Sequence, residues 1–229
     1  MAWFSEHSLL CILLLAGAAT FAWLLYRRDR LRMRPLWALP LAAGHVVLGV
    51  LCVKAFAILE AGSLEKAGNM SLFGAVFLLP PFYWLGAKLT KRRAKDVFDV
   101  FTVPTVFTLA CARVNCILSG CCLGKPIPGT DLRWPTREAE LVFYAALLLW
   151  LHWRTRRGDE RGIFWPAYMA AYGVFRFLTE FFREPVSPLL HISHLWAVIS
   201  FLTGLSICLQ ILARSKTRKT KPTSHRRKS

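Results

Sequence analysis

The chain has 229 residues, 55% of them hydrophobic, with 30 basic against 13 acidic residues and a formal net charge of +17. In a soluble protein this balance would suggest a nucleic-acid partner, but here the basic residues lie in clusters between apolar runs of about 18–20 residues, the length of a membrane-spanning helix. The composition therefore argues against a nucleic-acid-binding protein and indicates a membrane protein whose immediate surrounding is the bilayer.

The apolar runs predict an all-α membrane protein with seven transmembrane helices. In chain order, we expect the spans at residues 8–26, 36–59, 70–86, 98–118, 139–153, 162–182 and 189–212. Pro80 and Pro81 in the third span predict a kink or a break in that helix. The spans form one transmembrane domain over residues 1–213, and we expect residues 214–229 to be a basic, disordered cytoplasmic tail.

The basic residues also predict how the chain lies in the membrane. Most of the 30 lysines and arginines lie in the stretches that follow the first, third, fifth and seventh spans. Because cytoplasmic loops carry such an excess, we expect the N-terminus outside and the C-terminus in the cytoplasm. The ends of the fourth and sixth spans, and the loop of residues 119–138, then meet at the outer face.

Two arginines lie inside predicted spans, Arg113 near the end of the fourth and Arg176 in the sixth. A charge there is costly unless it faces a protein interior or a water-filled cavity, so it marks a candidate functional site. On a helix, Arg176, Glu180 and Arg183 share one face. Two guanidinium groups in an apolar cleft can hold a phosphodiester, because their fork matches two phosphate oxygens. The alternative is a structural ion pair between Glu180 and Arg176 or Arg183.

Four of the seven cysteines gather around the end of the fourth span: Cys111, Cys116, Cys121 and Cys122. Adjacent cysteines rarely bond to each other, but Cys116 could form a disulfide with Cys121 or Cys122 in an oxidising outer compartment. A nucleophilic cysteine would need a nearby cation, such as Lys125 or Arg113. The spaced pairs of ligands typical of zinc sites are missing, and we expect no metal.

Titratable residues at the outer face are further candidates. Glu140 begins the fifth span, where a carboxylate either caps the helix or belongs to a site. His191 and His194 begin the last span, where either could act as a base on a thiol or lie at the membrane interface as an ordinary polar residue. In the second span, we expect His45 to be hydrogen-bonded between helices rather than catalytic.

Several segments carry a resemblance to a known family. Residues 113–126 read Arg-Val-Asn-Cys-Ile-Leu-Ser-Gly-Cys-Cys-Leu-Gly-Lys-Pro, and residues 172–183, the most specific match, read Tyr-Gly-Val-Phe-Arg-Phe-Leu-Thr-Glu-Phe-Phe-Arg. Shorter matches are Pro-Thr-Arg-Glu-Ala-Glu at 135–140 and Gly-Asn-Met-Ser-Leu-Phe-Gly at 68–74. Together they resemble the bacterial prolipoprotein diacylglyceryl transferases, in a cysteine-containing branch, over residues 36–212 and in the same order.

The resemblance implies a transferase of lipoprotein biosynthesis in the bacterial inner membrane, with its active site facing the periplasm or outer leaflet. Such an enzyme moves diacylglyceryl from phosphatidylglycerol to the lipobox cysteine thiol of a preprolipoprotein signal peptide, and we expect no cofactor. Arg113 and Arg176 match the family's two essential arginines. With the residue chemistry above, the expected catalytic residues are Arg113, Arg176, Glu140 and Cys121. The expected substrate-binding residues are Arg113, Arg176, Glu180, Arg183, Gly120, Gly124 and Lys125.

The chain departs from the family's pattern close to these residues. Well-studied members have a histidine where this chain has Phe73, and the signature's asparagine and glutamate are Cys116 and Cys121 here. One expected glutamine is Arg137, and another, near the last span, is Trp196. Two alternatives therefore stay open. One is a divergent transferase with another acceptor, acting through one of the adjacent cysteines, and the other is a lipid-binding membrane protein without catalytic activity.

Overall fold

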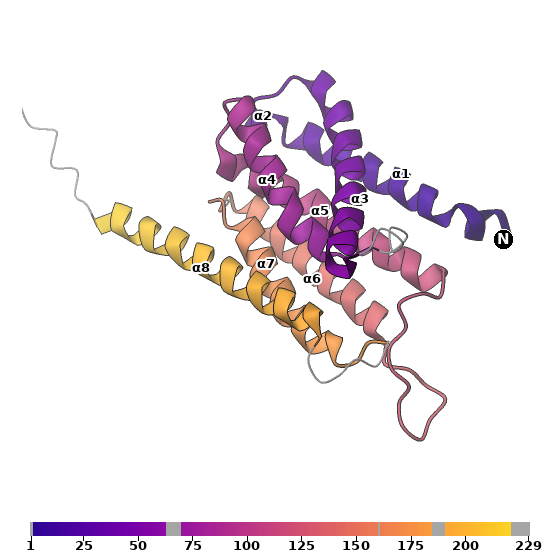
Figure 1. The fold of residues 1–229 in the computed structure, drawn as a ribbon. Helices are drawn as coiled ribbons and strands as arrows, with labels where there is room; N and C mark the ends of the chain where they lie inside the picture. The colour runs from indigo at the N-terminus through magenta and orange to yellow at the C-terminus, as the bar shows by residue number, and fades with distance from the viewer. Residues whose placement is uncertain (1, 63–69, 160, 185–190, 221–229) are drawn as a thin grey trace, which may run out of the picture.

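The computed structural model describes residues 2–62, 70–159, 161–184 and 191–220 of the chain. Within them the chain forms eight α-helices and a short 3-10 helix, arranged as in Figure 1. Their bounds are α1 Ala2–Tyr26, α2 Arg28–Leu31, η1 Pro35–Trp37, α3 Ala38–Ala61, α4 Phe73–Leu89, α5 Ala94–Leu118, α6 Thr136–Arg156, α7 Phe164–Glu180 and α8 Ile192–Thr220. Apart from two isolated β-bridges, these residues contain no strand, which confirms the all-α class.

Helices occupy all seven predicted spans, and four stretches are long and apolar enough to cross a membrane: His7–Tyr26, Pro35–Ala61, Ala94–Leu118 and Ile192–Ser215. α4 is apolar but has only 17 residues, while α6 and α7 carry the charges of the candidate site. These lengths and compositions are typical of a membrane protein. The count of seven spans and the orientation of the termini stay predictions.

Two helices extend further than predicted. α4 continues through Pro80 and Pro81, so the pair does not break the helix. Prolines are tolerated inside membrane helices because neighbouring groups satisfy the carbonyls that they leave free. α8 runs on to Thr220, past the predicted boundary at residue 213. The division into a transmembrane domain and a cytoplasmic tail stays a prediction, and residues 221–229 lie outside the described residues.

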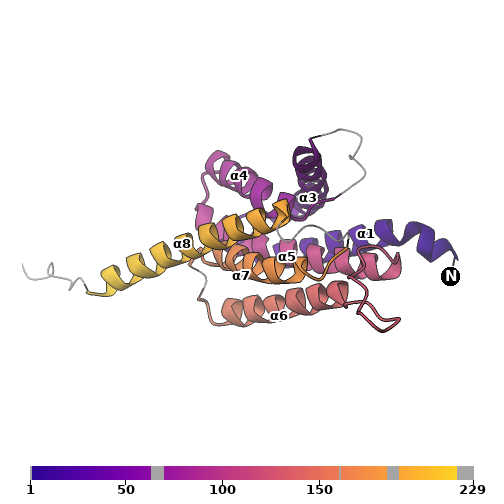
Figure 2. The same ribbon diagram turned by 60° about the horizontal axis from the view of Figure 1, so that its bottom comes forward.

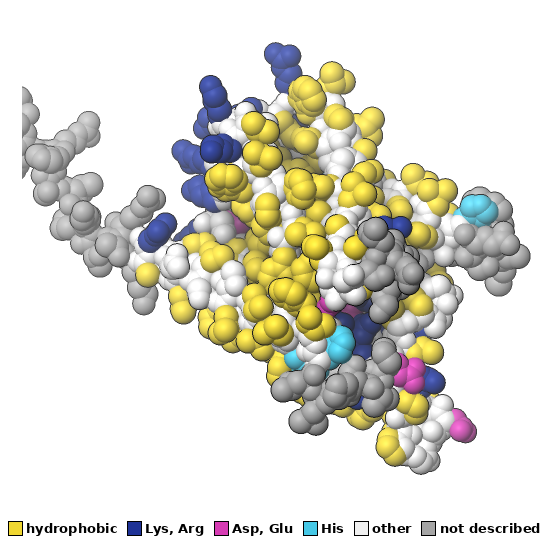
Figure 3. All heavy atoms as spheres, in the orientation of Figure 1, with side chains coloured by type: hydrophobic (Ala, Val, Ile, Leu, Met, Phe, Trp, Pro, Cys, Tyr) yellow, Lys and Arg dark blue, Asp and Glu magenta, His cyan; other side chains and the backbone are white. Residues whose placement is uncertain are grey.

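α5 is the central helix of the fold. It contacts α1, α4, α6 and α7, and Figure 2 shows α3 and α4 on one side of it and α6 on the other. The apolar stretch of α5 is 67% buried inside the protein, against 22% for that of α8. α8 packs along α7 and exposes leucines such as Leu202 and Leu209. Hydrophobic side chains cover much of the face seen in Figure 3, as expected for a surface in contact with lipid.

The two ends of α5 are held by different polar contacts. Near its N-terminal end, the buried Asp99 accepts hydrogen bonds from the backbone N–H of Gly162 at 2.7 Å and of Phe164 at 3.1 Å, and it pairs with Arg30 at 3.3 Å. Arg113 lies near the other end of the same helix, about 21 Å away at a rise of 1.5 Å per residue. The two polar regions are therefore separated by an apolar layer.

Candidate functional site

Glu140 is the centre of the candidate site. It lies in the second turn of α6 and is fully buried, with 0% of its surface exposed. Three arginines pair with its carboxylate: Arg113 of α5 at 2.5 Å, Arg183 just after α7 at 2.9 Å, and Arg176 of α7 at 3.0 Å. The structure thus brings together four of the residues that the sequence singled out, from three separate segments.

Glu180 completes this group. Arg176 pairs with it at 2.7 Å, across one turn of α7, as the spacing of four residues predicts. The structural ion pair that was left open as an alternative is therefore present, but Arg176 and Arg183 reach Glu140 as well. We refer to Glu140, Glu180 and the three arginines as the Glu140 cluster. Its three positive charges against two negative charges leave one excess positive charge.

The excess charge is largely shielded from water. The side chains of Arg113, Arg176 and Arg183 are 6%, 11% and 16% exposed. Charges in such surroundings are weakly screened, so an unbalanced guanidinium is costly and attracts an anion strongly. Guanidinium groups that converge from different helices match several oxygens of a phosphate group. The cluster can therefore bind a phosphate-bearing ligand and stabilise additional negative charge on it.

The loop between α5 and α6 packs against the end of α7. The backbone N–H of Lys125 donates to the carbonyl of Phe182 at 2.8 Å, and an antiparallel bridge joins Gly124 to Arg183. These contacts hold the backbone that carries Arg183. Lys125 therefore contributes through its main chain, and within the described residues its ammonium group forms no ion pair; its predicted contact with substrate stays a prediction.

The two predicted glycines shape the path of this loop. Gly120 has a φ of +68°, in the left-handed region that glycine adopts without strain. A side chain at Gly124 would collide with the carbonyl of Trp134, because the two arms of the loop approach each other closely there. The backbone requirement explains both glycines, and direct contact of either with a substrate stays a prediction.

Two arginines near the loop were not among the predicted site residues. Arg137 donates to the carbonyls of Cys116 at 3.3 Å and Cys121 at 3.4 Å, so it ties the turn after α5 to the start of α6. Arg133 pairs with Glu184 at 2.6 Å. In the sequence Arg137 counted only as a substituted glutamine. The sequence did carry a signal for Arg137, because it lies within residues 135–140, one of the segments that carry the family resemblance.

Three thiols gather beside Arg113. The Sγ atoms of Cys116, Cys121 and Cys122 lie within 4.8 Å of one another, and Arg113 Nη1 lies 3.7 Å from Cys116 Sγ. The turn therefore folds Cys116 back onto the adjacent pair, as the disulfide hypothesis required. All seven cysteines, each of which lies in the described residues, nevertheless have free thiols.

The two adjacent cysteines have different surroundings. Cys121 is exposed, and its sulfur accepts a hydrogen bond from Ser119 Oγ at 3.4 Å. Cys122 is half-buried, with its Sγ 3.9 Å from that of Cys116. The hydrogen bond from the Cys116 thiol lowers the pKa of Cys122, and the nearby arginine charges lower it further, against burial, which raises it. The catalytic role of Cys121 stays a prediction, and Cys122 is a second candidate.

Aromatic side chains lie beside the cluster. Tyr144 and Tyr172, one turn from Glu140 and Arg176 on their helices, are buried with their rings stacked. The hydroxyl of Tyr144 has no hydrogen-bond partner among the described residues. Phe73, where the resemblance expects a histidine, is buried with its ring centre 6.0 Å from the guanidinium carbon of Arg176. Tyr144 was not predicted, although its spacing of four residues from Glu140 places both on one face of α6.

The two histidines at the start of α8 take different positions. His194 is buried against the rings of Phe177 and Phe181, and its Nδ1 accepts the backbone N–H of His191 at 3.1 Å. Its Nε2 has no hydrogen-bond partner in the part of the chain that the structure describes. His191 is exposed. The role of either histidine as a base on a thiol stays a prediction.

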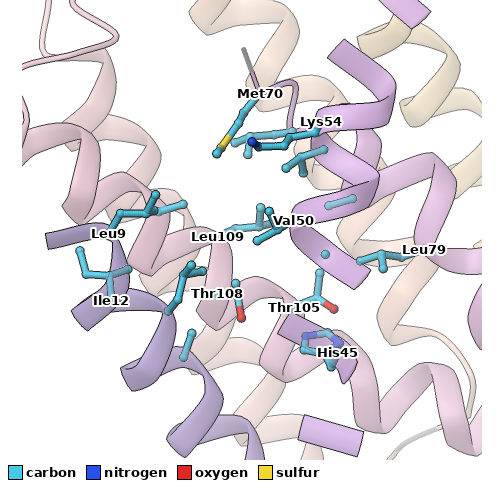
Figure 4. Close-up of a pocket in the computed structure, with 17 residues that line it drawn as sticks. Leu9, Ile12, His45, Val50, Lys54, Met70, Leu79, Thr105, Thr108 and Leu109 are labelled. Atoms are coloured by element: carbon cyan, nitrogen blue, oxygen red, sulfur yellow. The ribbon is translucent and has the colours of Figure 1, made fainter. Parts of the chain in front are cut away.

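An apolar cavity of about 200 Å³ lies between α1, α3, α4 and α5 (Figure 4). Lys54 lies at one end of it and His45 at the other. His45 Nδ1 hydrogen-bonds the hydroxyl of Tyr83 at 2.9 Å, which confirms the expected bond between helices. The lining includes Ala112, the neighbour of Arg113, but no side chain of the Glu140 cluster. The cavity suits an apolar chain.

Comparison with known proteins points to one family. Residues 11–210 match the family described as LGT, prolipoprotein diacylglyceryl transferase. Similar curated proteins, each named phosphatidylglycerol–prolipoprotein diacylglyceryl transferase, come from Cupriavidus metallidurans (30% identical over 137 residues), Clostridium tetani (29% over 135) and Polaromonas naphthalenivorans (32% over 136). Each alignment covers 52% of this chain, and 48%, 54% and 49% of these relatives in turn. The chain thus spans about half the length of the curated relatives it matches.

Proposed function

Because the chain belongs to the prolipoprotein diacylglyceryl transferase family, we propose that it transfers the diacylglyceryl group of phosphatidylglycerol to the cysteine thiol of a prolipoprotein signal peptide. The observation that carries the proposal is the excess positive charge of the buried Glu140 cluster. Phosphatidylglycerol brings a phosphodiester with one negative charge into the membrane, which balances that excess. An acyl chain of the lipid would enter the apolar cavity of Figure 4.

In this proposal Arg113 and Arg176 hold the phosphate. The acceptor thiol releases its proton to water and its sulfur attacks the glyceryl carbon, while the bond from that carbon to the phosphate oxygen breaks and glycerol phosphate leaves with the electron pair. The phosphate thereby changes from a diester with one negative charge to a monoester with up to two. Arginines fixed beside it stabilise the developing charge more than the starting charge, which lowers the barrier. Glu140 keeps the arginines converged until the lipid arrives.

The proposal includes a placement in the membrane. The chain would cross the bacterial inner membrane seven times, with the N-terminus outside and the Glu140 cluster near the periplasmic face. Two features support it. The polar regions at Asp99 and Arg113 lie about 21 Å apart along α5, within a hydrocarbon core of about 30 Å. In Figure 3, Lys and Arg side chains gather at the α2 end of the molecule, the end of α5 that carries Asp99, as expected of cytoplasmic loops.

A second function competes with this one, namely lipid binding without transfer. Phe73 favours it, because a buried phenyl ring beside Arg176 cannot accept or donate a proton as a histidine can. Under this alternative the Glu140 cluster holds the phosphate of the lipid, but no side chain at the position of Phe73 assists the acceptor thiol. The two functions share the same binding site and differ only in turnover.

The test uses the purified protein in nanodiscs that contain phosphatidylglycerol, with a lipobox peptide as acceptor. Transfer raises the peptide mass by one diacylglyceryl group. We expect this gain with a cysteine peptide and no gain with the matched serine peptide. Nanodiscs made of phosphatidylethanolamine serve as the donor control. Retention of phosphatidylglycerol without any gain in peptide mass would contradict the transferase and establish lipid binding instead.

A further inference from the structure

Cys116, Cys121 and Cys122, which we refer to as the thiol trio, have no part in the phosphate chemistry proposed above. Their Sγ atoms all lie within 4.8 Å of one another. Across residues 2–62, 70–159, 161–184 and 191–220, no other three ligand atoms of Cys, His, Asp or Glu are gathered in this way. The trio lies at the outer end of α5, next to the Glu140 cluster.

The spacing of the sulfurs suits a shared metal ion. A zinc–sulfur bond of about 2.3 Å gives neighbouring sulfurs in a tetrahedral site a separation of about 3.8 Å. The Sγ atoms of Cys116 and Cys122 are 3.9 Å apart, whereas a disulfide would require about 2.05 Å. Thiolates are also the ligands that soft and borderline cations such as Zn²⁺ favour in proteins. The structure places one pair of sulfurs at about this separation and the third within 4.8 Å of both.

The backbone of the turn holds the trio in an unusual conformation. Cys122 has a φ of 58°, in the left-handed region that residues other than glycine rarely adopt. Arg137 donates to the carbonyls of Cys116 and Cys121 and so clamps both sides of the turn. A strained residue that the surrounding contacts hold in place is typical of a functional site. The close approach of the three thiols is therefore built into the fold.

Charge and access also favour a metal ion here. Zn²⁺ with three thiolates is anionic, and Arg113 Nη1 lies 3.7 Å from Cys116 Sγ, where it can stabilise that charge. Cys121 is exposed, so an ion and a further ligand can reach the trio from outside. Three protein ligands leave the fourth tetrahedral position for a substrate or water, as in catalytic zinc sites.

We propose that the thiol trio binds Zn²⁺ through three thiolates and that its fourth position takes the acceptor thiol. The first half stands by itself, and the second rests on the proposed transferase. A zinc site would also give a physical reason for cysteines at two positions where the resemblance expects asparagine and glutamate. The ion would take over the activation of the thiol that other side chains provide in well-studied members.

The chemistry balances without a redox step. On binding to zinc, the acceptor thiol releases its proton to water. The bound sulfur attacks the glyceryl carbon, the carbon–oxygen bond to the phosphate breaks, and glycerol phosphate takes the electron pair. The product is a neutral thioether, a weaker ligand than a thiolate, so it dissociates from the ion. A covalent relay through Cys121 or Cys122 is disfavoured by the same chemistry, because a thioether formed there does not pass its lipid on.

The first experiment measures zinc in the intact protein. The chain is purified under reducing conditions, loaded with Zn²⁺, freed of excess metal, and analysed for zinc per chain by mass spectrometry. We expect one Zn²⁺ per chain for the wild type and for Cys208→Ser, a matched control in α8. The Cys116→Ser/Cys121→Ser/Cys122→Ser variant loses all three ligands, so we expect it to retain essentially no zinc. Equal zinc binding by the wild type and the triple variant would overturn the site.

A second measurement does not depend on whether the variants fold. In the wild-type protein, bound Zn²⁺ should protect Cys116, Cys121 and Cys122 from alkylation, while Cys11 and Cys208 alkylate at the same rate with and without the ion. Peptide mapping by mass spectrometry measures each thiol separately. Alkylation of the trio that is unchanged by Zn²⁺ would overturn the site as well.

A third measurement tests the open position. The protein is loaded with Co²⁺, whose bonds to sulfur absorb in the near ultraviolet, and a lipobox peptide is added without lipid. We expect the absorbance to grow with the cysteine peptide and not with the serine peptide. No growth would overturn the role of the fourth position and leave the zinc site standing. Zinc binding without transfer from phosphatidylglycerol would contradict only the proposed transferase, so the failures are distinguishable.

Discussion

Two fully buried carboxylates lie towards opposite ends of the molecule, and their partners differ in kind. Asp99 accepts backbone N–H groups from Gly162 and Phe164 in addition to pairing with Arg30. Glu140 meets guanidinium groups of side chains from three segments. Backbone donors are fixed by the fold, whereas long side chains can turn towards another anion. The comparison separates a carboxylate that fastens helices together from one that, in the proposed function, holds binding groups ready for a ligand.

Removing one arginine from each of the two polar regions should give the largest expected difference, which is a difference in transfer rate. Arg113→Ala removes a charged donor from the reacting phosphate, so we expect the transfer rate to fall about 10³-fold. Arg30→Ala, the matched change at Asp99, should lower thermal stability and leave the transfer rate nearly unchanged. The initial rate of peptide mass gain and a thermal unfolding curve measure the two effects. Equal losses of rate in two folded variants would remove the distinction between the ends.

Neutralising each of the two carboxylates should give the next largest effect, which is on the free energy of unfolding. Glu140→Gln leaves three buried arginines without their shared partner, so we expect a loss of about 3–5 kcal/mol in the free energy of unfolding. Glycerol phosphate should restore part of it by binding the same arginines. Asp99→Asn should also lose stability, because the two backbone N–H groups bind different oxygens of Asp99 and an amide offers only one, but glycerol phosphate should not restore it. Thermal unfolding with and without glycerol phosphate checks both, and equal restoration of the two variants would contradict the comparison.

A smaller effect is expected at the turn that carries the thiol trio. Arg137→Ala releases the carbonyls of Cys116 and Cys121, so we expect zinc affinity to fall by about tenfold, as for groups that orient metal ligands. Arg137→Lys should restore part of it through one remaining donor. Zinc competition with a chelator measures the affinity. Unchanged affinity in Arg137→Ala would show that the turn does not depend on this clamp.

The smallest effect is expected for Arg133→Ala. Its ion pair with Glu184 has side chains that are 41% and 37% exposed. Exposed pairs contribute about 0–1 kcal/mol because water screens them. We therefore expect little change in stability and none in zinc affinity or transfer rate, which makes this variant the matched control for Arg137→Ala. A rate loss comparable with that of Arg113→Ala would mean that the arginines of the loop also belong to the phosphate site.

Most of the helices could be predicted because each apolar run must satisfy its own backbone hydrogen bonds in lipid. The ends were harder to predict. Pro80 and Pro81 carry a local signal for a break, but contacts with neighbouring helices decide whether the helix continues. α8 continues to Thr220 through basic residues that an apolar window does not include. Local composition therefore predicts that a helix is present better than it predicts the residues at which the helix begins and ends.

The members of the site could be predicted more readily than its arrangement. Arg113 and Arg176 stand out because charges inside apolar runs are costly. That both meet Glu140 depends on how α5, α6 and α7 pack, and no spacing in the sequence encodes this distance. The thiol trio likewise depends on the left-handed backbone of Cys122, which sequence patterns do not favour at a cysteine.

The central claim is that the Glu140 cluster, and not the polar region at Asp99, binds a phosphate ester. Calorimetric titration with glycerol phosphate tests it directly on the wild type, Arg113→Ala and Arg30→Ala. We predict equal affinity for the wild type and Arg30→Ala, and affinity at least about tenfold weaker for Arg113→Ala, the cost of one lost hydrogen bond to a charged group. Binding by folded Arg113→Ala that is as tight as that of the wild type would contradict the account.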